Sequence, residues 1–218
     1  MLPQVRSPRA WLRVMQLARE MGGLDDIEKL TFVRACEWYE ELEGAGKLDA
    51  DALSFVNSIA SVSLSNEDWA SYCEAHSAIL PKLVVEITEE EEMNERELER
   101  KRNVPGSTGV FALDDYGSGY SNGNSLLTIA PKYVKVDIAI IRGIDTDADK
   151  QQFLMTLIDY AHPRGVQVLA EGVETLSELR TVPEMGVDLL QGYCLAPPAA
   201  EPGALHEQPA DVHAQVAP

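Results

Sequence analysis

Residues 110–120 read VFALDDYGSGY: a short apolar run ends in two adjacent carboxylates, Asp114 and Asp115, and continues into a glycine-rich loop. The run has the length and composition of a β-strand that is covered on both faces. Adjacent carboxylates repel each other, so a purely structural strand end rarely needs both. The pair therefore indicates a functional site, and a solvated strand end is the simpler alternative.

Similar short apolar runs, rich in Val, Ile and Leu, occur on both sides of this one and predict further strands. They are LSFVN (53–57), LVVEI (83–87), YVKVD (133–137), VQVLA (166–170) and VDLLQ (187–191). Amphipathic segments with helix-start residues such as Ser65 and Thr175 predict helices. These segments are 7–21, 26–43, 65–79, 89–102, 149–164 and 175–185. Strand starts recur about every 20 to 35 residues, which is the period of a βα unit.

This repeated order predicts the α/β class, as either an open doubly wound sheet or a barrel of eight βα units. A dinucleotide-binding sheet needs a glycine-rich turn after its first strand, but Asn57-Ser58-Ile59 follows that strand here. The barrel is therefore favoured, with about six of its eight strands visible. We expect a partial barrel over residues 1–198 and a disordered, Pro/Ala-rich tail over residues 199–218.

Composition limits the classes of function. The chain has 218 residues, of which 45% are hydrophobic, and its net charge is −18. Such a charge argues against nonspecific binding to DNA, RNA or an acidic membrane, although metal ions can lie between an acidic protein and a phosphodiester. Three widely spaced cysteines indicate thiols in a reducing compartment. Since neither a signal peptide nor a membrane span is evident, we expect a cytoplasmic protein.

Polar side chains stand at or just beyond the carboxyl ends of the predicted strands. In a parallel barrel these ends meet at one rim, where active sites lie. The residues are Asn57, Glu86, Asp114, Asp115, Glu171 and Gln191. Lys135 lies within a strand, and the alternation of side chains places it and Asp137 on one face, so that both can point inward.

Several carboxylates at one rim need a counter-charge, and hard divalent cations such as Mg²⁺ or Mn²⁺ prefer oxygen ligands. The adjacent pair suits a site with two metal ions about 3.5–4 Å apart. Each residue also has a simpler explanation: Asn57 as a turn former, Glu86 as a helix start, Lys135 as a side chain that reaches the surface, Glu171 as part of a turn. Their joint placement at successive strand ends favours the metal site.

Several segments resemble, in order, the signatures of the EAL domain, a family of bacterial cyclic di-GMP phosphodiesterases built as a β/α barrel. The segments are VEITE (85–89), ALDDYGSGYSN (112–122), KVD (135–137), LAEGVET (169–175) and GVDLLQGYCLAPP (186–198). Residues 55–69 also resemble the family's asparagine-bearing strand and the helix after it. The resemblance extends from about residue 7 to residue 198 and implies hydrolysis of one phosphodiester of cyclic di-GMP to the linear dinucleotide pGpG.

The resemblance also implies roles for the rim residues. Asn57, Glu86 and Asp114 would bind one metal ion, and Asp114, Asp115 and Glu171 the second. Lys135 would orient or polarise the attacking water. Gln191 would support the site near the substrate, and Glu89 would tether the mobile loop 116–122. The implied catalytic residues are Lys135 and Glu171, and the supporting residues are Gln191, Glu89, Gly117 and Gly119.

One departure from the family is clear: no Glu-Ala-Leu triplet occurs in the chain. In the family that glutamate completes the first metal site, so we expect the chain to begin just after the motif, without the first two strands. Segments 53–57 and 187–191 would then be open sheet edges, able to pair with another chain. We expect little hydrolysis by the chain alone.

Three interpretations stay open: an impaired or truncated phosphodiesterase, a degenerate module that binds cyclic di-GMP or a protein without catalysis, and a remnant that does not fold stably. Expected partners are cyclic di-GMP and either a second copy of the chain or an upstream sensory domain.

Overall fold

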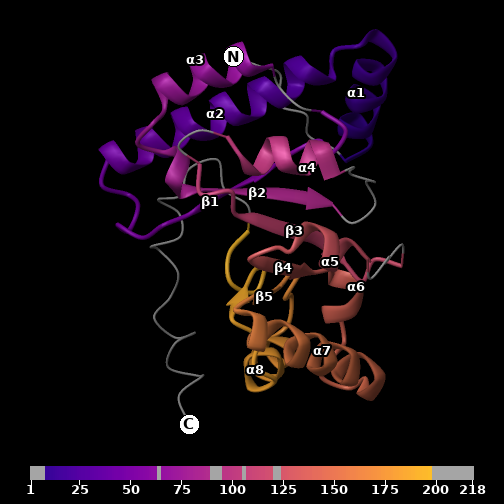
Figure 1. Ribbon diagram of the computed structural model, residues 1–218. Helices are drawn as coiled ribbons and strands as arrows, with labels where there is room; N and C mark the ends of the chain where they lie inside the picture. Colours follow the sequence, from indigo (N-terminus) through magenta and orange to yellow (C-terminus); the bar gives the residue numbers. More distant parts are fainter. Residues whose placement is uncertain (1–7, 63–64, 89–94, 105–106, 120–123, 198–218) are drawn as a thin grey trace.

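Six strands form one parallel sheet in the order β1-β2-β3-β4-β5-β6 (Figure 1). The computed structural model describes residues 8–62, 65–88, 95–104, 107–119 and 124–197. The strands are β1 Ser54–Asn57, β2 Leu83–Thr88, β3 Phe111–Tyr116, β4 Tyr133–Val136, β5 Gln167–Ala170 and β6 Leu189–Leu190. Each predicted strand is confirmed, and the strands follow one another around the sheet in chain order, as in a β/α barrel.

Two helices precede these strands, and the others lie between them in the chain. The helices are α1 Pro8–Met21, α2 Leu24–Gly44, α3 Asn66–Ala75, α4 Glu95–Arg102, α5 Asn124–Ile129, α6 Ile138–Ile141, α7 Ala148–Ala161 and α8 Leu176–Glu184, with 3-10 turns η1 Leu80–Lys82 and η2 His162–Arg164. The predicted helix 65–79 ends early, at Ala75, and the predicted helix 149–164 ends in the turn η2. The first part of the predicted helix 89–102 lies outside the described residues. Neither α5 nor α6 was predicted.

The two predicted helix caps are present. Ser65 accepts a hydrogen bond from the backbone N–H of Asp68. Thr175 forms a capping box with Glu178. The side chain of each residue accepts a hydrogen bond from the backbone N–H of the other. These contacts satisfy backbone N–H groups that have no partner inside the helix, so they fix where α3 and α8 begin.

The sheet divides the apolar side chains into an outer and an inner layer. Its outer face, with Val56, Ile87, Phe111, Val134 and similar side chains, forms the main core under the helices. Helix α2 contacts β1, α5 contacts β3 and α7 contacts β5, so α1–α4 gather at one end of the sheet and α5–α8 at the other (Figure 1). The inner face carries a small separate cluster of Val84, Ala112 and Tyr133.

The described part of the chain is thus a curled, six-stranded half-barrel with β1 and β6 at its edges. The expected tail, 199–218, lies outside the described residues. All three cysteines are free thiols, as expected. Among the described helices, none is both long enough and apolar enough to cross a bilayer.

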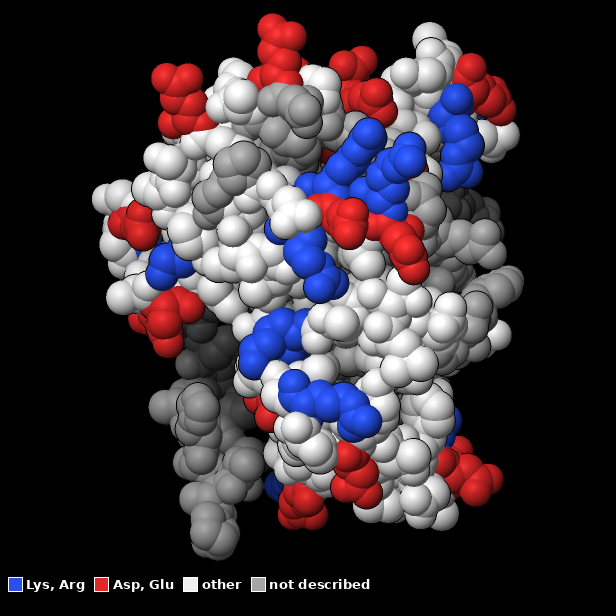
Figure 2. Space-filling view, viewed as in Figure 1, with Lys and Arg blue, Asp and Glu red and all other residues white. Residues whose placement is uncertain are grey.

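The negative charge is unevenly distributed. On the face shown in Figure 2, Lys and Arg side chains gather along the middle of the molecule, and most Asp and Glu side chains lie towards its periphery. The net charge of −18 therefore does not act as one uniform negative surface.

Glu178, in α8, is hydrogen-bonded to the loop after α6, and substituting it tests how much these contacts stabilise the fold. Its buried carboxylate accepts hydrogen bonds from the backbone N–H groups of Gly143, Glu174 and Thr175, at 2.8, 2.9 and 3.0 Å. Burial opposes the charge, but these three N–H groups outweigh it and lower the pKa of Glu178.

We expect Glu178→Gln to lower the free energy of unfolding by about 1–3 kcal/mol at pH 7, because an amide N–H₂ then faces backbone donors. A carboxyl group with a lowered folded-state pKa stabilises the fold above its unfolded pKa and ceases to do so as the pH falls through the folded value. The difference from wild type should therefore vanish in acid. Urea unfolding between pH 7 and pH 3 measures it, with the exposed Glu184→Gln as the control. An equal loss at all pH values would contradict the prediction.

Candidate metal and catalytic centre

A β-bulge brings the adjacent carboxylates of Asp114 and Asp115 to one site. In a regular strand, neighbouring side chains point to opposite faces. Here the register between β3 and β4 shifts between Leu113 and Tyr116, and Asp115 has a φ of 56°. This left-handed conformation is one that aspartate tolerates better than most residues. Asp114, Asp115 and Glu171 consequently place one carboxylate oxygen each within 4.8 Å of one another.

Lys135 lies at the centre of the carboxylates. Its Nζ is 2.6 Å from Oε1 of Glu86, 2.8 Å from Oδ1 of Asp114 and 2.8 Å from Oε1 of Glu171. The side chain of Lys135 is only 7% exposed. The alternative in which Lys135 extends to the surface is therefore wrong, because the ammonium is buried on the inner face. An ammonium has three N–H donors, so three carboxylates can engage all of them.

Burial and charge act against each other in this cluster. Burial disfavours the charge on Lys135, but the carboxylates of Glu86, Asp114 and Glu171 outweigh it and raise the pKa of Lys135. Burial also raises the pKa of Glu86 and of Glu171, and Lys135 only partly opposes this effect. Four carboxylates around one ammonium therefore leave the site short of positive charge.

Asn57 and Gln191 occupy the neighbouring strand ends. Asn57 pairs in register with Glu86, so both side chains belong to the inner face of the sheet. Gln191 directly follows β6, and its backbone N–H donates to the carbonyl of Ala170 at 2.9 Å, next to Glu171. The structure thus places six of the predicted residues at the carboxyl ends of the strands: Asn57, Glu86, Asp114, Asp115, Glu171 and Gln191. Asp137 is different: its carboxylate accepts from the N–H of Ala139 and caps α6.

The predicted loop residues are only partly described. Glu89 lies outside the described residues, as does the part of the loop beyond Gly119. A Cβ on Gly117 would lie 2.9 Å from Cγ1 of Ile140, whereas a Cβ on Gly119 would meet no atom of the described residues within 4 Å, its chain neighbours aside. Neither glycine is placed against the carboxylates by these contacts, so their role toward a substrate stays a prediction.

Two glycines that sequence reasoning did not single out allow neighbouring segments to pack closely at the rim. A Cβ on Gly172, which follows Glu171, would lie 2.3 Å from Cγ1 of Ile138. A Cβ on Gly192 would lie 2.2 Å from the carbonyl oxygen of Val173. Only glycine allows these close approaches. The signal in the sequence was their position, each directly after a predicted site residue.

The donor set fits divalent metal ions. Every candidate ligand atom is an oxygen, from carboxylates and one amide, as Mg²⁺ and Mn²⁺ prefer. The three oxygens within 4.8 Å of one another are close enough to share an ion. The excess of carboxylates over ammonium groups supplies the electrostatic reason for a cation to bind.

Comparison with known proteins agrees with this geometry. A family model described as EAL domain matches residues 4–198. The probable cyclic di-GMP phosphodiesterase PdeG of Escherichia coli is 33% identical over 113 residues, which are 51% of this chain and 22% of PdeG. The chain therefore spans about a fifth of that relative.

Solved structures share the fold. The PaMucR phosphodiesterase in complex with c-di-GMP has a TM-score of 0.74 at 23% identity, covering 88% of this chain and 79% of that one. The manganese and cy-diGMP complex of Klebsiella pneumoniae BlrP1 has a TM-score of 0.66 at 24% identity, covering 78% of this chain and 45% of that one. The expectation of a barrel-type fold is confirmed.

Proposed function

The chain belongs to the EAL domain family, and on this premise we propose that it is a cyclic di-GMP phosphodiesterase module whose inner rim hydrolyses one phosphodiester to give linear pGpG. The observation that carries the proposal is the cluster of Glu86, Asp114, Asp115 and Glu171 around Lys135. Such a cluster at the carboxyl ends of parallel strands is where barrel enzymes place their chemistry.

The EAL family is metal-dependent, and for this chain we propose two ions of Mg²⁺ or Mn²⁺. Asp114, Asp115 and Glu171 would hold one, and Asn57, Glu86 and Asp114 the other. A bound divalent cation lowers the pKa of a coordinated water and offsets negative charge on a phosphoryl oxygen. In the reaction water gives its OH to phosphorus, one P–O ester bond breaks, and the leaving ribose oxygen takes up a proton.

The hydrogen bonds of Lys135 to its carboxylate partners limit what it can do in this reaction. All three of its carboxylate partners lie within hydrogen-bond distance of Nζ. To donate to an attacking water, Lys135 must release one of them. Glu86, Asp114 or Glu171 would give up its hydrogen bond from Lys135 if it held a cation, because the carboxylate would then have another positive partner. Lys135 would thereby become a water-orienting group only in the metal-loaded state.

We expect weak hydrolysis by this chain, since no Glu-Ala-Leu glutamate joins Asn57 and Glu86 in the first metal site. The measurement is a single-turnover assay with protein in excess over cyclic di-GMP, in Mg²⁺ or Mn²⁺, with detection of pGpG. Metal-dependent product that Glu171→Gln abolishes would support the proposal. If cyclic di-GMP neither binds nor is cleaved in either metal, the proposal is wrong.

A second candidate function is a module that binds cyclic di-GMP without cleaving it. The contacts of Lys135 favour it: Nζ already lies 2.6–2.8 Å from Glu86, Asp114 and Glu171, so the groups present could hold a phosphodiester through an ion without activating water efficiently. The same assay separates the two functions: bound cyclic di-GMP that stays intact over many hours indicates the binding module.

A further inference from the structure

A second buried polar cluster lies just beyond the end of β1, apart from the carboxylates of the metal centre. It consists of Glu28 from α2, Ser58 and Ile59 after β1, and Lys101 from α4. Glu28 is 1% exposed, Lys101 5% and Ser58 9%. Buried charges of this kind are uncommon, and they need specific partners.

The contacts in this cluster converge on the two residues that follow Asn57. Oε1 of Glu28 accepts from Oγ of Ser58 at 2.5 Å, and Oε2 accepts from the backbone N–H of Ile59 at 2.8 Å. Nζ of Lys101 donates to Oε1 of Glu28 and to Oγ of Ser58, both at 2.7 Å. The carboxylate of Glu28 thus binds the side chain of Ser58 and the backbone of Ile59.

The same segment is also fixed to the metal centre. The backbone N–H of Ser58 donates to the carbonyl of Glu86 at 2.9 Å, and Asn57 pairs in register with Glu86. In the described sheet β1 is an edge strand, paired on one side only. Glu28 from α2 and Lys101 from α4 therefore restrain the two residues that follow Asn57 on the other side of the segment.

We propose that Glu28 and Lys101 are positioning residues that hold the end of β1 so that Asn57 stays beside Glu86 as a metal ligand. The inference rests on the proposed function, because it takes Asn57 as a ligand. Neither Glu28 nor Lys101 reaches the metal centre by any of the contacts above. They act through Ser58 and Ile59, as outer residues do when they orient a ligand.

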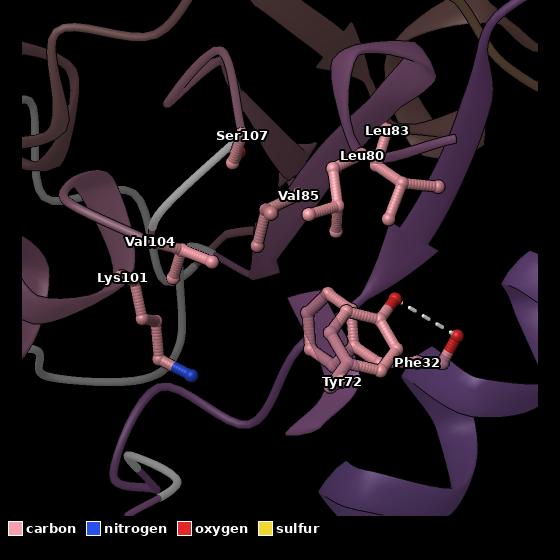
Figure 3. Close-up of a pocket in the computed structure, with 8 residues that line it drawn as sticks. All are labelled: Phe32, Tyr72, Leu80, Leu83, Val85, Lys101, Val104 and Ser107. Carbon is pink, nitrogen blue, oxygen red and sulfur yellow. Dashed lines mark hydrogen bonds between the residues drawn. The ribbon is translucent and has the colours of Figure 1, made fainter. Parts of the chain in front are cut away.

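Stability alone is a weak explanation for this pair. A buried ion pair contributes little compared with well-packed apolar side chains of similar size, because both charges lose their hydration. The cavity beside Lys101 measures about 10 Å³, which is barely room for one water, and Lys101 lies on its wall opposite Tyr72 and Phe32 (Figure 3). The cavity is too small for a ligand, and among the residues that the structure describes the Nζ of Lys101 donates to Glu28 and Ser58.

The test uses two variants of the full chain. Ser58→Ala keeps the Glu28–Lys101 pair but removes the side-chain tie, and Glu28→Leu combined with Lys101→Met removes both charges together, so that neither stays buried alone. We expect each to keep the cooperative unfolding of wild type and to bind Mn²⁺ about tenfold more weakly in calorimetry, the effect typical of outer residues at metal sites. In an Asn57→Ala background, Ser58→Ala should have no further effect.

Lys29→Ala is the matched control. Lys29 lies on α2 next to Glu28, and its loss removes only an exposed ion pair with Asp68, so Mn²⁺ affinity should stay unchanged. The inference is overturned if both variants bind Mn²⁺ as wild type does, or if Ser58→Ala weakens binding equally with and without Asn57. Wild-type chain that binds Mn²⁺ but yields no pGpG would overturn the proposed hydrolysis and leave the positioning role standing. Wild-type chain that binds neither Mn²⁺ nor Mg²⁺ would overturn both.

Discussion

Lys135→Met is expected to lower the free energy of unfolding by about 3–5 kcal/mol in metal-free buffer, the range observed when one member of a buried ion pair is removed. The substitution leaves Glu86, Asp114 and Glu171 facing one another at a site where Lys135 contacted each within 2.8 Å. The methionine fills most of the volume of the lysine stem, so the loss reports charge and not a cavity.

Metal ions should reverse much of this loss. A divalent cation supplies the counter-charge that Lys135 provided, so Mn²⁺ or Mg²⁺ should raise the melting temperature of Lys135→Met more than that of wild type. Thermal unfolding with and without metal measures the effect. Lys135→Arg is the control: it keeps the charge in a larger, planar group, so we expect a smaller loss. Equal stability of wild type and Lys135→Met without metal would contradict the description of the site.

Much of the architecture could be predicted from the sequence because it depends on local patterns. Six short apolar runs became six strands, and Ser65 and Thr175 became helix caps. Helices α5 and α6 were missed because they have six and four residues, too few to display a helical period. The carboxylate of Asp137 was expected inside, but a residue just beyond the end of β4 no longer follows the alternation of the strand.

The functional groups were predicted better than their geometry. Position at the strand ends identified the rim residues, but alternation alone would have separated Asp114 from Asp115. The bulge that reunites them depends on how β3 pairs with β4. Lys101 and Glu28 are 73 residues apart in sequence, and no local pattern connects them. Contacts of that kind arise only from the packing of α2 and α4 near β1.

Asp115→Asn should weaken Mn²⁺ binding by more than about 100-fold, because changes to outer residues already reach 10–100-fold and this one removes a ligand oxygen's charge. The backbone should tolerate the change, since asparagine adopts the φ of 56° found at Asp115 as readily as aspartate does. Without metal, the variant should unfold no more easily than wild type, and its crowded carboxylates repel one another less. Affinity and stability would then move independently, as expected for a functional group.

Asp115→Ala separates the ligand from the backbone. It also removes the carboxylate, but it places an ordinary side chain in the left-handed region, at a cost of about 1–2 kcal/mol in stability. Calorimetric titration with Mn²⁺ and urea unfolding of both variants measure the two effects. Both variants should lose Mn²⁺ affinity, and only the alanine variant should lose stability. If Asp115→Asn binds Mn²⁺ as tightly as wild type, the bulge serves the fold alone, and the second carboxylate of the pair has no part in holding the ion.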